Sequence, residues 1–473
     1  MADLRSWLEK TAQAGDLKEY TGADWNLDIA YLTTCNWKKD DAPALLFDKI
    51  KGYPEGFRVL TSSIRTQGRV ASVLNVPVAK TYREQLQILR GKVREWDANI
   101  DKFAPVTVAG GPVLENIQEK DDVDVFKFPV PLWHEKDGGR YIGTGDAMIT
   151  HDPDTGEVNI GTYRVMIHDK KHLGLYLAPG RHARLHLEKH HAQGKPCPIA
   201  LSVGHHPLLF IVASQECPPG TEYNYLGAIQ GSAQEVIKEE ITGLPIPADS
   251  EMVIVGWCKP GDTKIEGPFG EFTGYYASGA RPGPIIEVER VYFRNNPIIL
   301  GSPPGRPPNE TSLYYSLVRS AMLHNQLELS GVPDITGVCC HEWRTFFIAV
   351  SLRQRYAGHA KQAALLTSEL TGSGGIGPKY ILVVDEDIDV TNIRELLWAL
   401  CTRSDPSKSI DIIRNVRSSP LDPAIRKSAE EFSTSRAILD ACRPFGWRNE
   451  FPEVIDFSPA IRKAMYDKWG EEC

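Results

Sequence analysis

The chain has 473 residues, of which 42% are hydrophobic and 24% are charged, and this is the composition of a globular protein with about two or three domains. The formal net charge is −8, from 53 basic and 61 acidic residues, and the absence of a concentrated basic tract argues against nucleic acid as the main partner. Nine scattered cysteines without a CxxC pair predict reduced thiols and a cytoplasmic protein. No run of about 18 apolar residues occurs, so no segment is expected to span a membrane.

Residues 1–110 are predicted to form an N-terminal α/β domain. The first segment, "MADLRSWLEKTAQAGDLKEY", lacks the apolar core of a signal peptide and has the pattern of an amphipathic helix. A second helix is predicted in "YREQLQILRGKVREWDANI", where Leu86, Leu89, Val93 and Trp96 recur at helical spacing. "FRVLTSS" predicts a short strand, and the Pro and Gly residues of "FAPVTVAGGPVLENI" indicate the domain boundary.

Residues 111–310 are predicted to form a second domain that is rich in strands. The expected strands are "VFKFPV", "AMITHD", "IALSVG", "LLFIVAS", "EMVIVGW" and "IIEVERVYF". Short strands separated by turns predict an antiparallel sheet or a barrel. One helical insertion, "RHARLHLEKHHAQG", is expected among them.

Residues 311–473 change to long helices that alternate with strands. "TSLYYSLVRSAMLHNQLELSG", "TFFIAVSLR", "KQAALLTSELTG", "YILVVDED" and "NIRELLWALCTR" predict a βαβ-type domain with a partly parallel sheet. "NIRE" at 392–395 has the pattern of a capping box. The last 45 residues are polar with aromatic residues at intervals, and they fit either a tail that docks on a second subunit or a helix on its own domain.

Two glutamates, Glu266 and Glu271, flank a tight turn in "IEGPFGEFTGYY". Two close carboxylates cannot both ionise without cost, so the pKa of one would rise and that group would become a proton donor near neutral pH. Arg164, in the apolar segment "NIGTYRVMIHD", would supply the counter-charge and could hold a substrate carboxylate through two hydrogen bonds. The alternative is that both glutamates are solvated loop residues.

The histidines and glycines form weaker patterns. His186 and His190 lie four residues apart on the expected helix and could be a metal pair, but without a third ligand nearby a solvated helix face is favoured. "GHHP" at 204–207 is equally ambiguous, and no HExxH or cysteine spacing for zinc occurs. "TGSGGIGPKY" precedes its strand rather than following one, so it predicts a loop bordering a ligand or a structural turn, not a dinucleotide site.

Several blocks occur together in one order: "PALLFDKIKGYP", "NIGTYR", "APGRH", "VIKEEITGLPIP", "IEGPFGEFTGYY", "ILVVDEDIDV", "LLWALCTR" and "SSPLDP". From about residue 43 to 425 they resemble the UbiD family of reversible decarboxylases, which use prenylated FMN. The resemblance implies a multidomain α+β and α/β architecture: an N-terminal α/β domain, a central split β-barrel of the flavin-reductase type that binds the cofactor, and a C-terminal α/β domain for substrate and oligomerisation.

The resemblance also implies the site residues. Arg164, Glu266 and Glu271 correspond to the catalytic network. Asn159, His182 and Glu240 correspond to the ligands of a divalent ion, Mn²⁺ or Mg²⁺, that ties the cofactor phosphate to the protein. The other cofactor-binding residues implied are Gly161, Thr162, Tyr163 and Arg181, with a K⁺ or Na⁺ site near Ser214. The substrate pocket is expected to include Thr311, Tyr315, Ser419 and Leu421.

The reaction implied is the reversible, non-oxidative decarboxylation of an aromatic, heteroaromatic or α,β-unsaturated carboxylic acid through a transient substrate–cofactor adduct, with Glu271 as proton donor. The small Ser419 stands where members acting on cinnamic acid carry a bulky aromatic residue, which favours a ring-containing substrate. A flavin prenyltransferase would supply the cofactor, and a homodimer or homohexamer is expected. The alternatives are an FMN-dependent reductase or oxidase on a split-barrel fold, and a non-enzymatic subunit.

Overall fold

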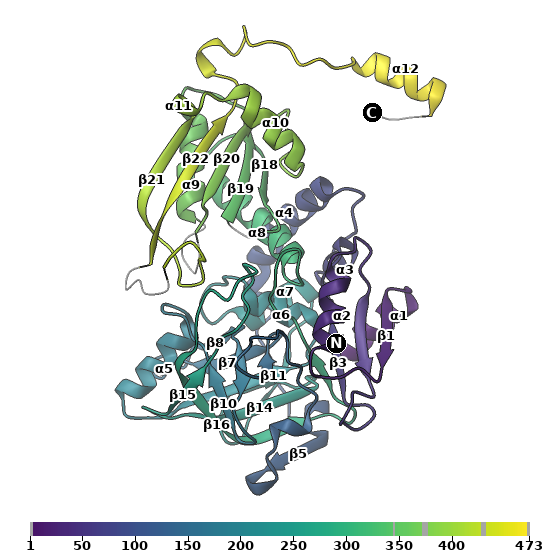
Figure 1. Cartoon of the computed structure of the whole chain (residues 1–473), viewed down its shortest axis with the longest axis vertical. Coiled ribbons are helices and arrows are strands. Elements are labelled where there is room, and N and C mark those ends of the chain that lie inside the picture. The colour runs from purple at the N-terminus through teal and green to yellow at the C-terminus, as the bar shows by residue number, and fades with distance from the viewer. Residues whose placement is uncertain (1–2, 344–345, 371–376, 427–431, 471–473) are drawn as a thin grey trace.

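The structure, a computed structural model, describes residues 3–343, 346–370, 377–426 and 432–470. Figure 1 shows an N-terminal region beside a large central sheet, with a separate C-terminal domain stacked on both. The predicted fold class, α+β and α/β in several domains, is confirmed by this architecture. No helix in these ranges is long and apolar enough to cross a membrane.

The N-terminal region is a mixed four-stranded sheet with helices around it. Its strands and helices are α1 (Leu4–Gln13), β1 (Leu17–Thr21), α2 (Asp28–Trp37), β2 (Ala44–Asp48), β3 (Arg58–Thr61), α3 (Gln67–Val73) and α4 (Tyr82–Asn99). The strand order is β1-β2-β3-β17, and the last strand, β17 (Ile298–Leu300), comes from far along the chain to pair in parallel with β3. The predicted helix α4 starts with a capping box between Thr81 and Glu84, and its apolar face is buried as expected.

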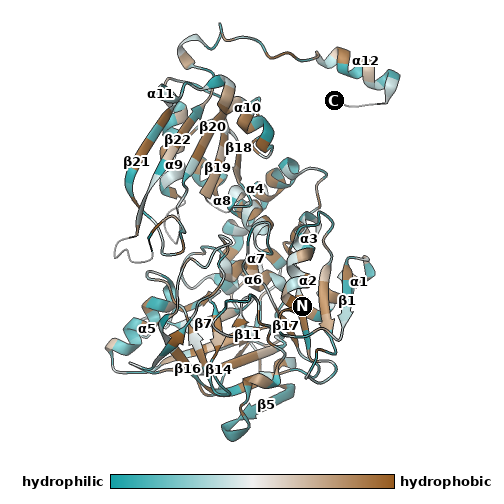
Figure 2. Ribbon diagram, viewed as in Figure 1, coloured by the Kyte–Doolittle hydropathy of each residue, from teal (hydrophilic) through white to brown (hydrophobic). Residues whose placement is uncertain are grey.

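The central sheet has ten strands, and the pairings within it are antiparallel, as predicted. Its main order is β6-β9-β10-β16-β14-β11-β7-β8, with β5 and β15 also paired to β16. The strands are β5 (Asn116–Glu119), β6 (Tyr141–Gly143), β7 (Ala147–His151), β8 (Val158–Gly161), β9 (Val165–Ile167), β10 (His172–Leu175), β11 (Cys197–Val203), β14 (Met252–Cys258), β15 (Thr263–Glu266) and β16 (Arg281–Phe293). Figure 2 shows that β11, β14 and β16 are largely hydrophobic, as expected for strands with core on their faces.

Three helices lie in this central part of the chain: α5 (His182–Ala192), α6 (Pro207–Ser214) and α7 (Glu222–Gln230). The prediction of α5 is confirmed, but the prediction that "LLFIVAS" is a strand is wrong, because these residues form α6. His206 caps α6 by accepting from the Leu208 N–H, and Pro207 occupies its first turn. "VFKFPV" is likewise not a strand but contains a single 3₁₀ turn, Val125–Lys127. A small sheet joins β4 (Val106–Thr107), β12 (Glu235–Lys238) and β13 (Pro245–Pro247).

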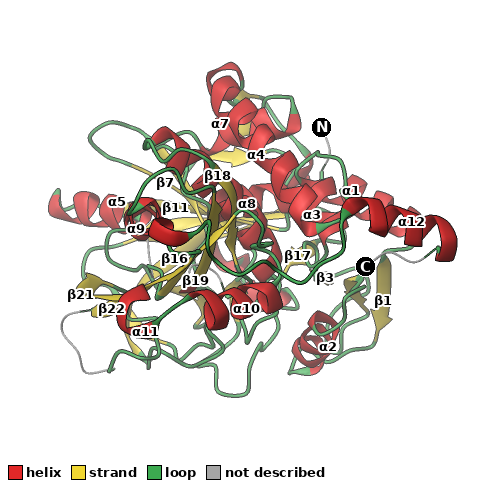
Figure 3. Cartoon of the chain, turned by 90° about the horizontal axis from the view of Figure 1, so that it is seen from above, coloured by secondary structure: helices red, strands yellow, loops and turns green. Residues whose placement is uncertain are grey.

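The C-terminal domain has a five-stranded sheet of order β18-β19-β20-β22-β21, in which β19, β20 and β22 are parallel, so the partly parallel sheet is confirmed. Its elements are β18 (Ile335–Cys340), β19 (Phe347–Leu352), α9 (His359–Leu370), β20 (Tyr380–Asp385), α10 (Ile393–Arg403), α11 (Pro406–Ser409), β21 (Ile410–Arg417) and β22 (Ser433–Ala441). Separate apolar clusters under α9 and under α10 cover the two faces, and Figure 3 shows both helices beside the strands. Asn392 caps α10 as predicted, although the Glu395 carboxylate accepts from the Asp389 N–H instead of the Asn392 N–H.

Helix α8 (Ser312–Leu329) connects the domains. It packs against α4 and against β18 of the C-terminal sheet, while its first turn lies near the central sheet. At the other end of the domain, α12 (Pro459–Trp469) extends away from the body and has no buried residue (Figure 1).

Candidate functional site

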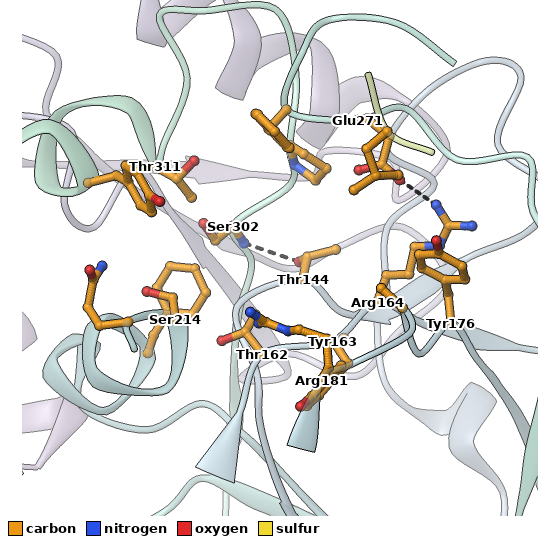
Figure 4. A pocket seen from close by; sticks show the side chains of 18 of the residues that line it. Thr144, Thr162, Tyr163, Arg164, Tyr176, Arg181, Ser214, Glu271, Ser302 and Thr311 are labelled. Carbon is orange, nitrogen blue, oxygen red and sulfur yellow. Dashed lines mark hydrogen bonds and ion pairs between the residues drawn. The ribbon is translucent and has the colours of Figure 1, made fainter. Parts of the chain in front are cut away.

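A cavity of about 290 Å³ lies where the central sheet, α6, α8 and the loop after β21 meet. Its lining residues are Gly143, Thr144, Thr162, Tyr163, Arg164, Tyr176, Ala178, Arg181, Phe210, Ser214, Gln215, Glu216, Phe269, Glu271, Phe272, Ser302, Pro304, Thr311, Tyr314, Tyr315, Arg319, Ser419 and Leu421. Figure 4 shows Arg164 and Glu271 pointing toward one another at one side of the cavity, with Ser214 and Thr311 at the opposite side.

The three predicted catalytic side chains lie together. Arg164, between β8 and β9, donates from Nε and Nη2 to the two carboxylate oxygens of Glu266, at 2.9 and 2.7 Å. Its Nη1 donates to Glu271 Oε1 at 2.5 Å. Glu266 ends β15 and Glu271 follows in the next loop, where Gly267 adopts φ +87° and so allows the chain to reverse between them. Residues from two distant parts of the sequence therefore form one ion-paired cluster.

The two glutamates differ in their surroundings. Glu266 is fully buried, does not line the cavity, and accepts a further hydrogen bond of 2.8 Å from the Tyr141 hydroxyl. Glu271 lines the cavity beside Phe269 and Phe272. Burial acts to lower the pKa of Arg164, but the carboxylates of Glu271 and Glu266 raise it above its ordinary value. Burial and the Glu266 charge also raise the pKa of Tyr141, so Tyr141 stays a hydrogen-bond donor. Glu266 is thus held in place behind Arg164, while Glu271 is placed to meet a bound molecule.

The remaining residues predicted for cofactor and substrate fall mostly on the cavity wall. Thr162, Tyr163, Arg181, Ser214, Thr311, Tyr315, Ser419 and Leu421 all line it. Gly161 does not, but it lies directly behind Tyr163, since a Cβ at this glycine would come within 2.6 Å of the Tyr163 ring. A side chain there would collide with the ring, so Gly161 allows Tyr163 to lie close to the strand backbone.

The predicted metal ligands are only partly brought together. Asn159 lies on the edge strand β8, and its amide nitrogen is buried with no hydrogen-bond partner among the residues that the structure describes. His182 is the first residue of α5, which packs on β8. Glu240 does not join them: its side chain is 82% exposed and pairs at 3.2 Å with Arg290. Arg290 is far from Asn159 along the central sheet. The strand register leads from Arg290 through Val255, Ala200 and Ile149 to the residue that follows Asn159, and these four strand spacings amount to roughly 19 Å.

Another carboxylate, which the sequence interpretation missed, lies beside β8. Glu222 is the first residue of α7, is 5% exposed, and hydrogen-bonds the backbone of Ile160, the residue after Asn159. Burial raises the pKa of its carboxyl to about 7. Within the described ranges, no cation forms an ion pair with it. An amide, an imidazole and a carboxylate fit Mn²⁺ or Mg²⁺ better than a tetrahedral zinc site. The signal available in the sequence was an acid at the start of the apolar segment "EYNYLGAIQ".

The other histidine predictions have simpler outcomes. His186 and His190 were expected on a solvated face, but both are buried, because α5 packs this face on β7 and β11. His186 bonds Thr150 at 3.0 Å and His190 approaches the carbonyl of His151 at 3.3 Å. Across the described chain, no group of three or more His, Cys, Asp or Glu side chains is arranged to hold a metal. Residues 371–376 of the glycine-rich segment lie outside the described residues.

The chain is similar to known proteins along almost its full length. Models of the 3-octaprenyl-4-hydroxybenzoate carboxy-lyase (UbiD) family match in order: the N-terminal domain at residues 8–89, the Rift-related domain at 105–307 and the C-terminal domain at 312–441. The pyrrole-2-carboxylic acid decarboxylase of Pseudomonas aeruginosa is 30% identical, over 99% of this chain and 98% of its own.

Two solved structures show the same fold. The vanillic acid decarboxylase of Sedimentibacter hydroxybenzoicus in its open form matches with a TM-score of 0.85 and 30% identity, covering 99% of this chain and 98% of its own. An evolved dimeric form of the UbiD-class enzyme HmfF from Pelotomaculum thermopropionicum, in complex with prenylated FMN, matches with a TM-score of 0.82 and 26% identity, covering 99% and 100%.

Proposed function

Because this chain belongs to the UbiD family of carboxy-lyases, we propose that it reversibly decarboxylates an aromatic, heteroaromatic or α,β-unsaturated carboxylic acid with prenylated FMN as cofactor. The observation that carries the proposal is the cluster of Arg164, Glu266 and Glu271, in which one carboxylate is enclosed and the other faces the cavity. The two acids named for the relatives, pyrrole-2-carboxylic acid and vanillic acid, favour a ring-containing substrate here as well.

Each of the three side chains has a proposed role. Arg164 orients the substrate carboxylate, and Glu266, anchored by Arg164 and Tyr141, keeps the guanidinium in place. When bound, prenylated FMN supplies an electrophilic centre that accepts the electron pair left on carbon as the bond to CO2 breaks. Glu271 then gives its proton to that carbon and regains one from solvent. In the reverse direction the Glu271 carboxylate removes the proton before CO2 adds.

The cofactor phosphate is proposed to lie near β8. Asn159, His182 and Glu222 would hold the divalent ion, which offsets the phosphate charge. Helices α5 and α7 both contact this strand, α7 through its first residue, and the amino ends of helices favour anions. A K⁺ or Na⁺ ion is proposed near Ser214, which α8 also reaches through a 2.8 Å hydrogen bond from the Tyr314 hydroxyl.

We also propose that the chain is a homodimer or a larger homo-oligomer. An 11-residue helix is marginal in water unless it packs on something, and the described part of the chain buries no residue of α12. Ile455, Phe457, Ile461, Met465 and Trp469 expose apolar surface along this tail. A second subunit would cover that surface, and the molar mass from light scattering should therefore exceed that of one chain; a monomer would contradict this proposal.

The experiment that tests the reaction is a panel of aromatic, heteroaromatic and acrylic acids. The protein would be co-expressed with a flavin prenyltransferase, and CO2 release measured for each acid. We expect release from at least one ring-containing acid, and none from protein made without the prenyltransferase. The alternative, an FMN-dependent reductase or oxidase, predicts NAD(P)H oxidation that needs only ordinary FMN, and this result would overturn the proposal.

A further inference from the structure

The guanidinium of Arg164 has a third kind of neighbour besides the two glutamates. Its Cζ lies 4.3 Å from the centre of the Tyr176 ring, and Cζ of Arg281 lies at the same distance from that ring. Tyr176 follows β10 and its N–H donates to the Arg164 carbonyl at 3.4 Å, so backbone and side chain both hold it beside Arg164. The ring also lines the cavity (Figure 4). One aromatic ring is thus shared by two cations at the edge of the site.

Arg281 differs from Arg164 in its charge balance. It opens β16, directly across from Glu266 on β15, yet no described carboxylate forms an ion pair with it. Its Nε and Nη2 are buried without a hydrogen-bond partner among the described residues. Arg281 as a whole is only partly buried, but its two enclosed nitrogens lose water without gaining an acceptor, and the electron-rich face of the Tyr176 ring offsets part of this cost. Tyr176 therefore stabilises a positive charge that nothing else in the cluster neutralises.

The charges of the cluster explain what this arrangement does. Arg164 and Arg281 carry two positive charges, Glu266 carries one negative charge, and Glu271 carries none when it holds the proton to be donated. The cluster then has one positive charge in excess behind the cavity wall, in addition to Arg181 on the wall itself, and this excess favours an incoming carboxylate. Without Arg281, the cluster in the same state would be neutral and would attract an incoming carboxylate less strongly.

We propose that Tyr176 is a positioning residue: its ring holds the guanidinium of Arg164 in place and keeps Arg281 next to it, so that the pair attracts the carboxylate of the substrate. This inference rests on the proposed function and adds to it the residues that place the substrate anion. The face of the ring does this work rather than its hydroxyl, since phenylalanine offers the same face.

Three variants test the inference in the cofactor-loaded enzyme. Tyr176→Leu removes the ring and should raise KM for the acid about tenfold with a smaller change in kcat, since cation–π pairs contribute about 2- to 30-fold in an equilibrium constant. Arg281→Met keeps the aliphatic stem, removes the charge, and should raise KM similarly. Tyr176→Phe retains the ring and should return KM to within about twofold of the original. If Phe is as harmful as Leu, or if kcat falls while KM stays constant, the inference is wrong.

A second measurement needs neither cofactor nor substrate. Urea unfolding of Tyr176→Leu, Arg281→Met and the double variant gives a double-mutant cycle for stability. The loss of stability in the double variant should differ from the sum of the two single losses, by about 2- to 30-fold in the unfolding equilibrium constant. Strictly additive losses would overturn the inference. The cycle measures stability and does not depend on turnover. If the losses of stability are additive but the protein is an active decarboxylase, the inference fails and the proposed function stands. If the two residues are coupled but the protein acts on none of the acids, only the proposed function is contradicted.

Discussion

The two sides of the cavity are built from different chemistry. The side from the central sheet carries the ion-paired cluster, in which Arg164, Glu266 and Tyr141 fix one another through hydrogen bonds of 2.7 to 2.9 Å. The side from α8 and the loop after β21 presents Thr311, Tyr315, Ser419 and Leu421, and the Arg319 guanidinium on this side is paired with Glu216 at 3.5 Å. The side from the central sheet holds the charged groups and the proton donor, and the C-terminal side determines which substrate shapes fit the cavity. Because the two sides belong to different parts of the fold, changes to one should leave the chemistry of the other intact.

The largest effect is expected from the charged side, in Glu271→Gln. The amide cannot give up a proton as an acid does, so kcat should fall by about 10² to 10⁴. The flavin absorbance of the purified protein should be unchanged, because Glu271 meets the substrate rather than holding the cofactor. Near-normal turnover would remove Glu271 from the role of proton donor.

Glu266→Gln is the matched variant for that experiment, since it changes the enclosed partner on the same side. Removing this charge leaves Arg164 buried with fewer counter-charges, and breaking a buried pair costs about 3–5 kcal/mol. A larger drop in the urea midpoint is therefore expected for Glu266→Gln, which disturbs two hydrogen bonds from Arg164, than for Glu271→Gln, which disturbs one. Equal loss of stability in both would contradict the difference between an enclosed and a cavity-facing glutamate.

The next largest effect is expected on metal binding, and it distinguishes Glu222 from Glu240 as the third metal ligand. Glu222→Gln should lower the Mn²⁺ content after gel filtration and weaken Mn²⁺ binding at least about tenfold, because the amide lacks the carboxylate charge. Glu240→Gln is the control and should retain Mn²⁺, since its exposed side chain pairs with Arg290 on the surface. Metal measured by mass spectrometry decides between them, and loss from Glu240→Gln alone would restore the original assignment.

This pair of acids shows where the sequence stops being informative about the site. Glu240 lies in a recognisable block, but spacing along the chain does not reveal which side chain turns inward. Glu222 is identified only when α7 is seen to pack on β8, which places its carboxylate beside Asn159. By contrast, Arg164, Glu266 and Glu271 were predictable, because charged residues in apolar segments must find partners when the chain folds.

The elements of the fold also divide into those that the sequence predicts and those that it does not. The alternation after residue 311 was predictable, since α8, α9 and α10 are longer than ordinary strands and the short apolar runs of β19 and β20 lie between them. Helix α6 was not, because every residue from Pro207 to Ala213 is buried and a continuous apolar run has no period to distinguish helix from strand. Strand β17 is three residues long and joins the N-terminal sheet only through tertiary pairing.

The smallest effect is expected on the side of α8 and the loop after β21, in Ser419→Phe. The ring would fill part of a cavity of about 290 Å³ and narrow it for cyclic acids. The ratio of kcat/KM for a ring-containing acid to that for a slim acrylic acid should fall by about tenfold, the range by which pocket contacts discriminate. Ser419→Ala removes the hydroxyl, which accepts from the Leu421 N–H at 3.3 Å, without adding volume, and should shift that ratio by less than about twofold. If Ala and Phe shift it equally, the hydroxyl and not the shape selects the substrate, and the C-terminal side contributes polar recognition in addition to volume.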